Sequence, residues 1–260
     1  MTRLALLACG LALAAAPGTA QEPERKVTLR WFGQSFFQLV DSTGQRVVID
    51  PHAIPTFGTP RVKADFVLIS HPHNDHNQPE ILDGPPKEAD IYRGVVEPKP
   101  GRQEWKAVAD KRGPVRFRNL PTYHDAVGGV QRGKNSVWLV EADGLVFCHL
   151  GDLGHELSAD QVKAIGKVDV LMVPVGGIYT INGEVAKKVV AQLKPRLFVI
   201  PMHYGVPGFD DILGPDEFLD EQKTLKKMTD TNELTIPADA KTPDAPAVVL
   251  LGWKTPELKK

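Results

Sequence analysis

Cysteine is scarce in this sequence, whose 260 residues contain only Cys9 and Cys148. Cys9 lies in an apolar leading segment that we expect to be removed, which leaves one thiol in the mature chain. A single thiol excludes an internal disulfide, so the fold must be stabilised by other means. Cys148 follows the apolar residues 145–147, and we predict that it packs in the core as a small hydrophobic side chain.

An excess of one sign of charge is also lacking. The chain has 31 Lys and Arg against 32 Asp and Glu, with no long block of like charge. We therefore expect neither a nucleic acid nor an anionic membrane surface as a partner. The hydrophobic fraction of 42% is ordinary for a soluble protein, and the length suits one large α/β domain or two small ones.

Long apolar runs are absent beyond the N-terminus. There, Arg3 precedes an apolar run over residues 4–16, and the small residues 18–20 precede Gln21. This run is too short to span a bilayer as a permanent helix. We predict a signal peptide over residues 1–20 that is cleaved near Ala20, and hence a periplasmic or secreted protein with one domain over residues 21–260. Lipidation at Cys9 is the alternative, although the apolar run continues past it.

Metal-ligating residue types are concentrated in one short stretch, with the pattern His71-x-His73-x-Asp75-His76. It follows residues 66–69, an apolar and partly β-branched run that predicts a buried strand. The stretch is then a loop at the carboxyl end of a strand, where open α/β sheets place their sites. Imidazole and carboxylate are ligands of zinc, and a tight loop can direct the first two histidines to one ion and the last two residues to another. A polar turn with surface histidines is the weaker interpretation.

Three more candidate ligands, His124, Asp152 and His203, each lie just beyond a predicted strand. One edge of a sheet could gather them near the histidine loop. Cys148 is a minor candidate for the same role. Asp50, after the predicted strand 46–49, is either an ordinary turn residue or an acceptor for backbone N–H groups of the metal loop.

The order of predicted elements indicates the architecture. Three strands form an opening meander, a hairpin lies in the middle, and strands then alternate with helices. This order favours two mixed sheets packed face to face with helices outside. The predicted strands are 27–31, 35–40, 46–49, 66–69, 91–92, 115–118, 136–141, 145–149, 168–173, 196–200 and 247–253. The predicted helices are 78–82, 158–165 with Ser158 as N-cap, 185–193, and 215–228, while 97–114 and 231–246 are predicted connections.

Together these motifs resemble the metallo-β-lactamase superfamily. Besides the histidine loop and the three later ligands, the matching signatures are Ile49-Asp50-Pro51 and Leu150-Gly151-Asp152. Within the superfamily the chain resembles the broad hydrolase group that includes ascorbate-6-phosphate lactonase. Three stretches carry that likeness: Trp31-x-Gly33-x-Ser35-x-Phe37, Pro174-Val175-Gly176-Gly177-x-Tyr179-Thr180 and Pro201-Met202-His203-Tyr204. That group usually has His where this chain has Gln34, so the role of Gln34 is open.

The resemblance implies an α/β fold of the αββα sandwich type and a site for two divalent ions. Zinc is the default from the ligand types, and manganese or iron would use the same residues. In this scheme one ion is held by His71, His73 and His124, the other by Asp75, His76 and His203, and Asp152 bridges both.

The expected activity is that of an exported metal-dependent hydrolase, in which a hydroxide shared by two ions cleaves a small ester, lactone or phosphoester. Asp75 and Asp152 are the candidate catalytic residues, and Asp75 would orient the nucleophile or take up its proton. Tyr179 and Tyr204 either hydrogen-bond the oxyanion or simply pack. His149 and His155 flank Asp152 and either support the ligands, contact the substrate, or have a packed or solvated role.

Two other functions are weighed against hydrolysis of such esters. A β-lactamase is less consistent with the sequence, because those enzymes carry Cys or Ser where Asp152 stands. A metal-binding scaffold without catalysis would be expected to lose ligands, and none is lost here.

Overall fold

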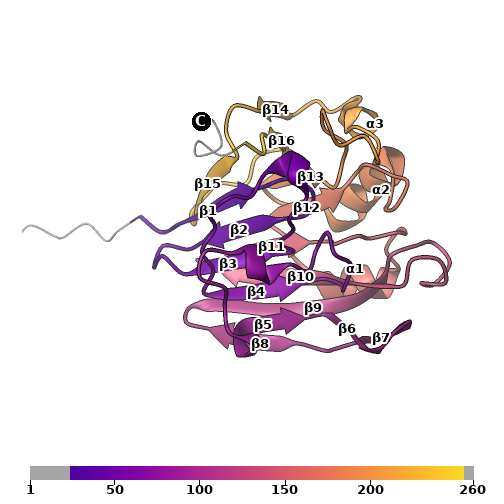
Figure 1. The fold of residues 1–260 in the computed structure, drawn as a ribbon. Helices are drawn as coiled ribbons and strands as arrows, with labels where there is room; N and C mark the ends of the chain where they lie inside the picture. The colour runs from indigo at the N-terminus through magenta and orange to yellow at the C-terminus, as the bar shows by residue number, and fades with distance from the viewer. Residues whose placement is uncertain (1–23, 255–260) are drawn as a thin grey trace, which may run out of the picture.

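Two mixed β-sheets pack face to face in the computed structural model, which describes residues 24–254 (Figure 1). The predicted signal peptide and Cys9 lie outside these residues. The six-stranded sheet has the order β15 (Glu233–Pro237), β1 (Lys26–Trp31), β2 (Phe37–Val40), β3 (Arg46–Ile49), β4 (Phe66–Ile69) and β5 (Ile91–Arg93). The eight-stranded sheet has the order β14 (Leu225–Met228), β16 (Ala247–Leu251), β13 (Phe198–Met202), β12 (Val170–Pro174), β11 (Leu145–His149), β10 (Lys134–Ala142), β9 (Val115–Tyr123) and β8 (Ala109–Arg112).

Strand direction determines where the loops of each sheet emerge. In the eight-stranded sheet, β11, β12 and β13 are parallel, and β9 runs in the same direction because β10 is antiparallel to both β9 and β11. The carboxyl ends of β9, β11 and β13 therefore meet at one edge. In the other sheet, β3, β4 and β5 are parallel.

Most buried apolar residues of the two sheets belong to one hydrophobic cluster, which includes Trp31, Phe66, Trp138 and Phe147. Cys148 belongs to this cluster and is fully buried, as predicted. Burial raises the pKa of its thiol, which keeps it protonated and unsuited to metal binding.

The described residues contain three α-helices: α1 (Ala159–Ile165), α2 (Gly183–Leu193) and α3 (Asp216–Leu219). Helices α1 and α2 pack against β9 and β12 of the eight-stranded sheet, and α3 packs against α2. Helix α1 begins at the predicted cap, because the Gln161 N–H donates to Ser158 Oγ and the Ser158 N–H donates to Gln161 Oε1. Helix α2 begins at Asn182, whose Oδ1 accepts the Val185 N–H at 3.1 Å.

The outer face of the six-stranded sheet is covered differently. Three 3-10 turns, η1 (Pro55–Phe57), η2 (Pro79–Ile81) and η3 (Glu88–Asp90), lie in the loops on either side of β4, and η2 stands where a short helix is predicted. A second, smaller cluster that includes Phe36, Val67 and Leu82 fills this face. The αββα sandwich is thus present with one helical layer reduced to short turns.

The prediction of a connection over 97–114 is wrong. Strands β6 (Val95–Lys99) and β7 (Arg102–Trp105) form a separate hairpin, and β8 pairs with β9. These strands are mostly polar and exposed, so their sequences lack the apolar alternation that a half-buried strand shows.

The long helix predicted over 215–228 is also wrong. Helix α3 ends at Leu219, and Glu221 has a left-handed backbone (φ 65°) that a continuous helix does not allow. Leu225 and Met228 lie instead on β14, an edge strand paired with β16. The apolar residues of this segment have helical spacing, but the backbone pairs with β16 and is therefore extended.

The polar loop predicted over 231–246 contains a strand, which corrects that prediction as well. Strand β15 pairs with β1, and its Leu234 and Ile236 are buried. The alternation of these two residues with polar neighbours was a usable signal for a half-buried strand.

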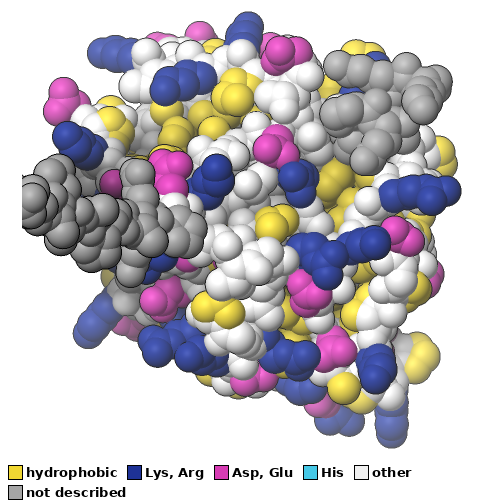
Figure 2. All heavy atoms as spheres, turned by 90° about the vertical axis from the view of Figure 1, so that its left-hand side faces the viewer, with side chains coloured by type: hydrophobic (Ala, Val, Ile, Leu, Met, Phe, Trp, Pro, Cys, Tyr) yellow, Lys and Arg dark blue, Asp and Glu magenta, His cyan; other side chains and the backbone are white. Residues whose placement is uncertain are grey.

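The surface carries mixed charge. Figure 2 shows Lys and Arg interleaved with Asp and Glu over the face at the left of Figure 1, without a large patch of either sign. Among the described residues, no helix is long and apolar enough to cross a membrane.

Candidate metal centre

The seven predicted metal ligands come together where both sheets contribute a loop. The histidine loop leaves β4, His124 directly follows β9, Asp152 follows β11, and His203 directly follows β13. Because the ends of these three strands meet at one edge of their sheet, they all face the loop of the opposite sheet. The residues form two groups of neighbouring ligand atoms: His71, His73 and His124 in the first, and Asp75, His76, Asp152 and His203 in the second.

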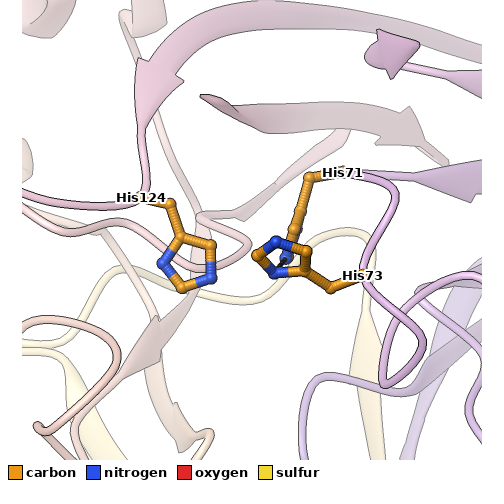
Figure 3. A group of neighbouring side chains, drawn as sticks. All are labelled: His71, His73 and His124. Carbon is orange, nitrogen blue, oxygen red and sulfur yellow. Dashed lines mark hydrogen bonds between the residues drawn. The ribbon is translucent and has the colours of Figure 1, made fainter. Parts of the chain in front are cut away.

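The first group consists of imidazoles alone. Figure 3 shows the ring of His124 directed across a gap toward the rings of His71 and His73. His71 Nε2 lies 3.1 Å from His73 Nδ1, and the ring of His124 lies 4.9 and 5.0 Å from the rings of these two histidines. Three nitrogen atoms thus converge from two loops.

Asp152 lies between the groups. Its Oδ2 is 3.1 Å from Nε2 of both His124 and His203, 3.2 Å from His76 Nε2, and 3.9 Å from His71 Nε2. Its other oxygen, Oδ1, is buried without a hydrogen-bond partner. This carboxylate is therefore in contact with ligand atoms of both groups.

These distances fit a metal site. Two ligands that share a tetrahedral ion at about 2.0–2.1 Å are about 3.3 Å apart, and the contacts within the groups are of that size. In the second group, for example, His76 Nε2 lies 3.4 Å from Asp75 Oδ2. The buried carboxylate Oδ1 of Asp152 and the buried Nδ1 of His203 lack partners within the protein, which is also expected of a site built for a further group.

The charge of the site also calls for a cation. Burial alone would raise the pKa of Asp152, but the neighbouring His203 and His76 outweigh it and hold that pKa well below its usual range. Burial would lower the pKa of His76, but Asp152 and Asp75 raise it well above its usual value. Two carboxylates thus lie among the candidate ligand imidazoles, and a divalent ion would offset their charge.

The imidazoles are aimed by hydrogen bonds on their other nitrogen atoms. His71 Nδ1 lies 2.9 Å from Ser70 Oγ, and His76 Nδ1 lies 3.0 Å from Asp50 Oδ2, which leaves Nε2 of each ring directed into the site. Burial keeps the pKa of His71 well below its usual value, so the ring is neutral, as a metal ligand must be.

Asp50 holds the start of the histidine loop by hydrogen bonds to Ser70. Its Oδ1 accepts the Ser70 N–H at 2.7 Å and its Oδ2 accepts the Ser70 hydroxyl at 2.6 Å. Asp50 thus contacts the metal loop as the second of its two predicted alternatives describes, by accepting a backbone N–H. The same carboxylate also orients His76.

Gln34 and Asn135 support the site and were not assigned to it from the sequence. Gln34 Nε2 donates to Asp75 Oδ2 at 3.1 Å, and its backbone carbonyl accepts the His203 N–H. Asn135 Oδ1 accepts the Asp152 N–H at 3.0 Å. Nothing in the sequence marks Asn135, because it stands between the polar residues Lys134 and Ser136 at the start of β10, although its amide is fully buried in the structure.

Of the other histidines and tyrosines considered for the site, some pack beside it and one lines the cavity. His149 Nε2 contacts the Ser35 carbonyl, and His155 Nε2 accepts the Tyr123 N–H, so both brace loops beside the site. Tyr204 is buried 5.2 Å from Trp31 and is not among the residues that line the cavity, whereas Tyr179 is half exposed and lines it.

A cavity of about 850 Å³ opens over the ligand groups. Its lining includes five of the candidate ligands together with Tyr179 and the loop that connects β9 to β10. A small-molecule substrate fits such a volume. The ligand residues that line the cavity are His73, Asp75, His124, Asp152 and His203.

Known proteins are similar to this chain in sequence and in architecture. The profile of a family described as "Beta-lactamase superfamily domain" matches residues 28–203. A UPF0173 metal-dependent hydrolase of Thermococcus onnurineus is 30% identical over 198 residues, which cover 68% of this chain and 84% of that protein. A crystal structure from Thermotoga maritima, titled as a Zn-dependent hydrolase of the metallo-β-lactamase superfamily, is 32% identical with a TM-score of 0.66, covering 87% of this chain and 98% of that one.

A second solved structure, a metal-dependent hydrolase of Parabacteroides distasonis, shares the fold at 20% identity and a TM-score of 0.58, covering 76% of this chain and 90% of that one. Fold, site and relatives together define the class of the protein, which is a metal-dependent hydrolase. The chain belongs to the metallo-β-lactamase superfamily. The resemblance drawn from the motifs is thereby confirmed.

Proposed function

We propose that this hydrolase uses two divalent metal ions, preferably zinc, to cleave a small ester, lactone or phosphoester. The observation that carries the proposal is the position of Asp152 Oδ2, within 3.1–3.9 Å of imidazole nitrogen atoms from both ligand groups. Two ions bound at these groups would lower the pKa of a shared water and polarise the substrate oxygen under attack.

The protein's own residues would bind and orient the reactants. Asp75 lies at the edge of the cavity, where its carboxylate can accept a proton from the nucleophile, and the amide of Gln34 holds it in place. Gln34 thus has the role of orienting Asp75. Tyr179 lines the cavity and is the remaining candidate donor to the oxyanion.

Metal analysis and a substrate panel test the proposal. The purified protein should contain about two ions per chain, and it should turn over at least one of a γ-lactone, a 4-nitrophenyl ester and bis(4-nitrophenyl) phosphate faster than nitrocefin, a β-lactam. One ion per chain in a fully active protein contradicts the two-ion site. Faster hydrolysis of nitrocefin than of the other substrates favours the β-lactamase alternative, and turnover of none favours the scaffold.

We also propose that the protein is exported to the periplasm or secreted, with no nucleic-acid partner and no membrane contact beyond export. The apolar run over residues 4–16 and the small residues before Gln21 support export. Intact-mass measurement of protein from the exported fraction should give a chain that begins at Gln21. A chain that begins at a diacylated Cys9 contradicts this cleavage site.

A further inference from the structure

The cavity over the metal centre has a basic wall. Arg102, Arg132 and Lys134 line it, whereas its acidic lining residues, Asp75 and Asp152, are the candidate metal ligands themselves. Arg102 pairs with Glu104 at 2.8 Å. Within residues 24–254, neither Arg132 nor Lys134 has a carboxylate within 4.0 Å. Two cations thus face the cavity without an acidic partner.

Aromatic rings hold these cations at the wall without neutralising them. The Arg132 guanidinium lies 5.6 Å from the centre of the Tyr179 ring, and Lys134 Nζ lies 4.6 Å from the centre of the Trp105 ring. Attraction to the ring faces restricts both side chains, and Arg132 Nη1 also donates to Gln131 Oε1 at 3.5 Å. The other N–H groups of the two cations are left to bind an anion.

The backbone that carries Arg132 has a defined shape. The buried carboxylate of Asp125 accepts the N–H groups of Val127, Gly129, Gln131 and Arg132 at 2.8–2.9 Å. The loop over residues 125–133 is therefore folded around one side chain, and its last residue bonds back to His124. The loop links the metal ligand and the basic wall in one rigid unit.

We propose that the substrate carries a carboxylate or phosphate remote from the bond that is cleaved, and that Arg132 and Lys134 bind this group. This inference rests on the proposed hydrolytic function. The metal centre would engage the scissile group while the basic wall engages the anion, so the wall determines which esters are accepted. Arg132 and Lys134 are therefore specificity-determining residues.

Three matched substrates test the proposal: 4-nitrophenyl hexanoate, mono-4-nitrophenyl adipate and 4-nitrophenyl 5-phosphonopentanoate. They share the scissile ester and a four-methylene spacer, and they end in methyl, carboxylate and phosphonate. The metal-loaded wild type should show kcat/KM about tenfold higher or more for an anionic ester than for the hexanoate. The ester with the higher value identifies whether carboxylate or phosphate is the preferred anion.

The variant Arg132→Gln/Lys134→Gln should reduce this preference about tenfold while leaving kcat/KM for the hexanoate within about twofold. Arg132→Lys/Lys134→Arg keeps both charges and should retain most of the preference. Lys226→Gln/Lys227→Gln, on the exposed part of β14, removes the same charge far from the cavity and should behave as wild type. An equal preference in wild type and Arg132→Gln/Lys134→Gln overturns the proposal.

A binding measurement separates this inference from the proposed hydrolysis. Adipamate, which carries one carboxylate and one amide, is titrated calorimetrically into the metal-loaded proteins whether or not any ester is turned over. Affinity should fall about tenfold in Arg132→Gln/Lys134→Gln. Absence of binding to wild type, or equal binding to both proteins, overturns the basic wall as an anion site. Weakened binding without turnover of any ester contradicts the hydrolytic function alone.

Discussion

Asp152 is the residue on which both ligand groups depend. Its backbone is held by Asn135 in a loop whose Gly151 has a left-handed backbone (φ 54°), and a Cβ on Gly151 would lie 2.4 Å from Asn135 Oδ1. Glycine is required there because only it combines this conformation with such a close approach. The close packing places the carboxylate between the two groups of imidazoles.

Asp152→Ala should weaken metal binding at both ligand groups and reduce kcat by more than about a hundredfold. The effect is large because the substitution removes a metal ligand and not merely a residue that orients one. Metal content by mass spectrometry and steady-state kinetics measure the two effects. His203→Ala should lose chiefly one ion and Asp110→Ala, at an exposed aspartate, none. Asp152→Cys should restore metal content only in part. Full activity in Asp152→Ala contradicts the assignment.

His52 gives stability a pH dependence of its own. Burial lowers the pKa of His52 to about 4, although its hydrogen bond to the Gly33 carbonyl opposes the shift. The unfolded chain takes up a proton near pH 6.5 and the folded chain only near pH 4. The contribution of neutral His52 is thus complete above pH 6.5 and is lost as the pH falls through this window.

Between pH 7 and pH 5, wild type should lose about 2 kcal/mol of unfolding free energy through His52. Denaturant unfolding of the metal-loaded wild type and of His52→Gln gives the unfolding free energy of each at both pH values. The contribution of His52 is the difference between the two proteins in how much unfolding free energy is lost. The variant is expected to start less stable at pH 7 and to lose about 2 kcal/mol less on acidification. Parallel pH profiles would show that His52 does not titrate in this way.

At the scale of elements, the loop over residues 125–133 connects packing with function. Asp125 ties four of its N–H groups to one buried carboxylate, and the preceding residue is a candidate metal ligand. Desolvation opposes ionisation of this carboxyl, but the N–H groups outweigh it and lower its pKa. The loop is therefore a folded unit rather than a flexible connection.

Asp125→Ala leaves these N–H groups without their acceptor and should destabilise the protein by about 3 kcal/mol. It should also lower kcat/KM for anionic esters more than for neutral ones, because Arg132 loses its defined position. Asp125→Asn, which keeps a neutral acceptor, should lie between alanine and wild type in chemical denaturation. A stability of Asp125→Ala equal to that of wild type would remove the loop from this role.

At the scale of the whole molecule, the ligand groups join the two sheets at one edge. The histidine loop belongs to the six-stranded sheet, while His124, Asp152 and His203 follow strands of the eight-stranded sheet. Ions bound to both would link the layers of the sandwich. Since the groups are assembled only in the folded chain, metal binding should add directly to stability.

Removal of metal by a chelator should therefore lower the melting temperature. At a free metal concentration a thousand times the Kd, one site adds about 4 kcal/mol, which for a chain of this size corresponds to on the order of 10 °C. Differential scanning calorimetry with and without added zinc measures the shift. Asp152→Ala should show little of it, and an equal shift in that variant would place the stabilising ion elsewhere.

The sequence by itself determined the local parts of this protein. Four candidate ligands lie within six residues after an apolar run, so the sequence alone places them on one loop. The buried strands, the cap of α1 and the order of the three later ligands are local patterns as well, and each could be predicted.

Only the tertiary structure decided which distant residues support the ligands and where exposed segments pair. The amide of Gln34 reaches Asp75 across 41 positions, and Asn135 holds the Asp152 loop across 17. Strands β8 and β14 form at sheet edges because a neighbour offers free backbone groups, while their own sequences remain polar or helical in pattern. Backbone pairing at an edge depends on the partner strand, and a single segment carries no record of its partner.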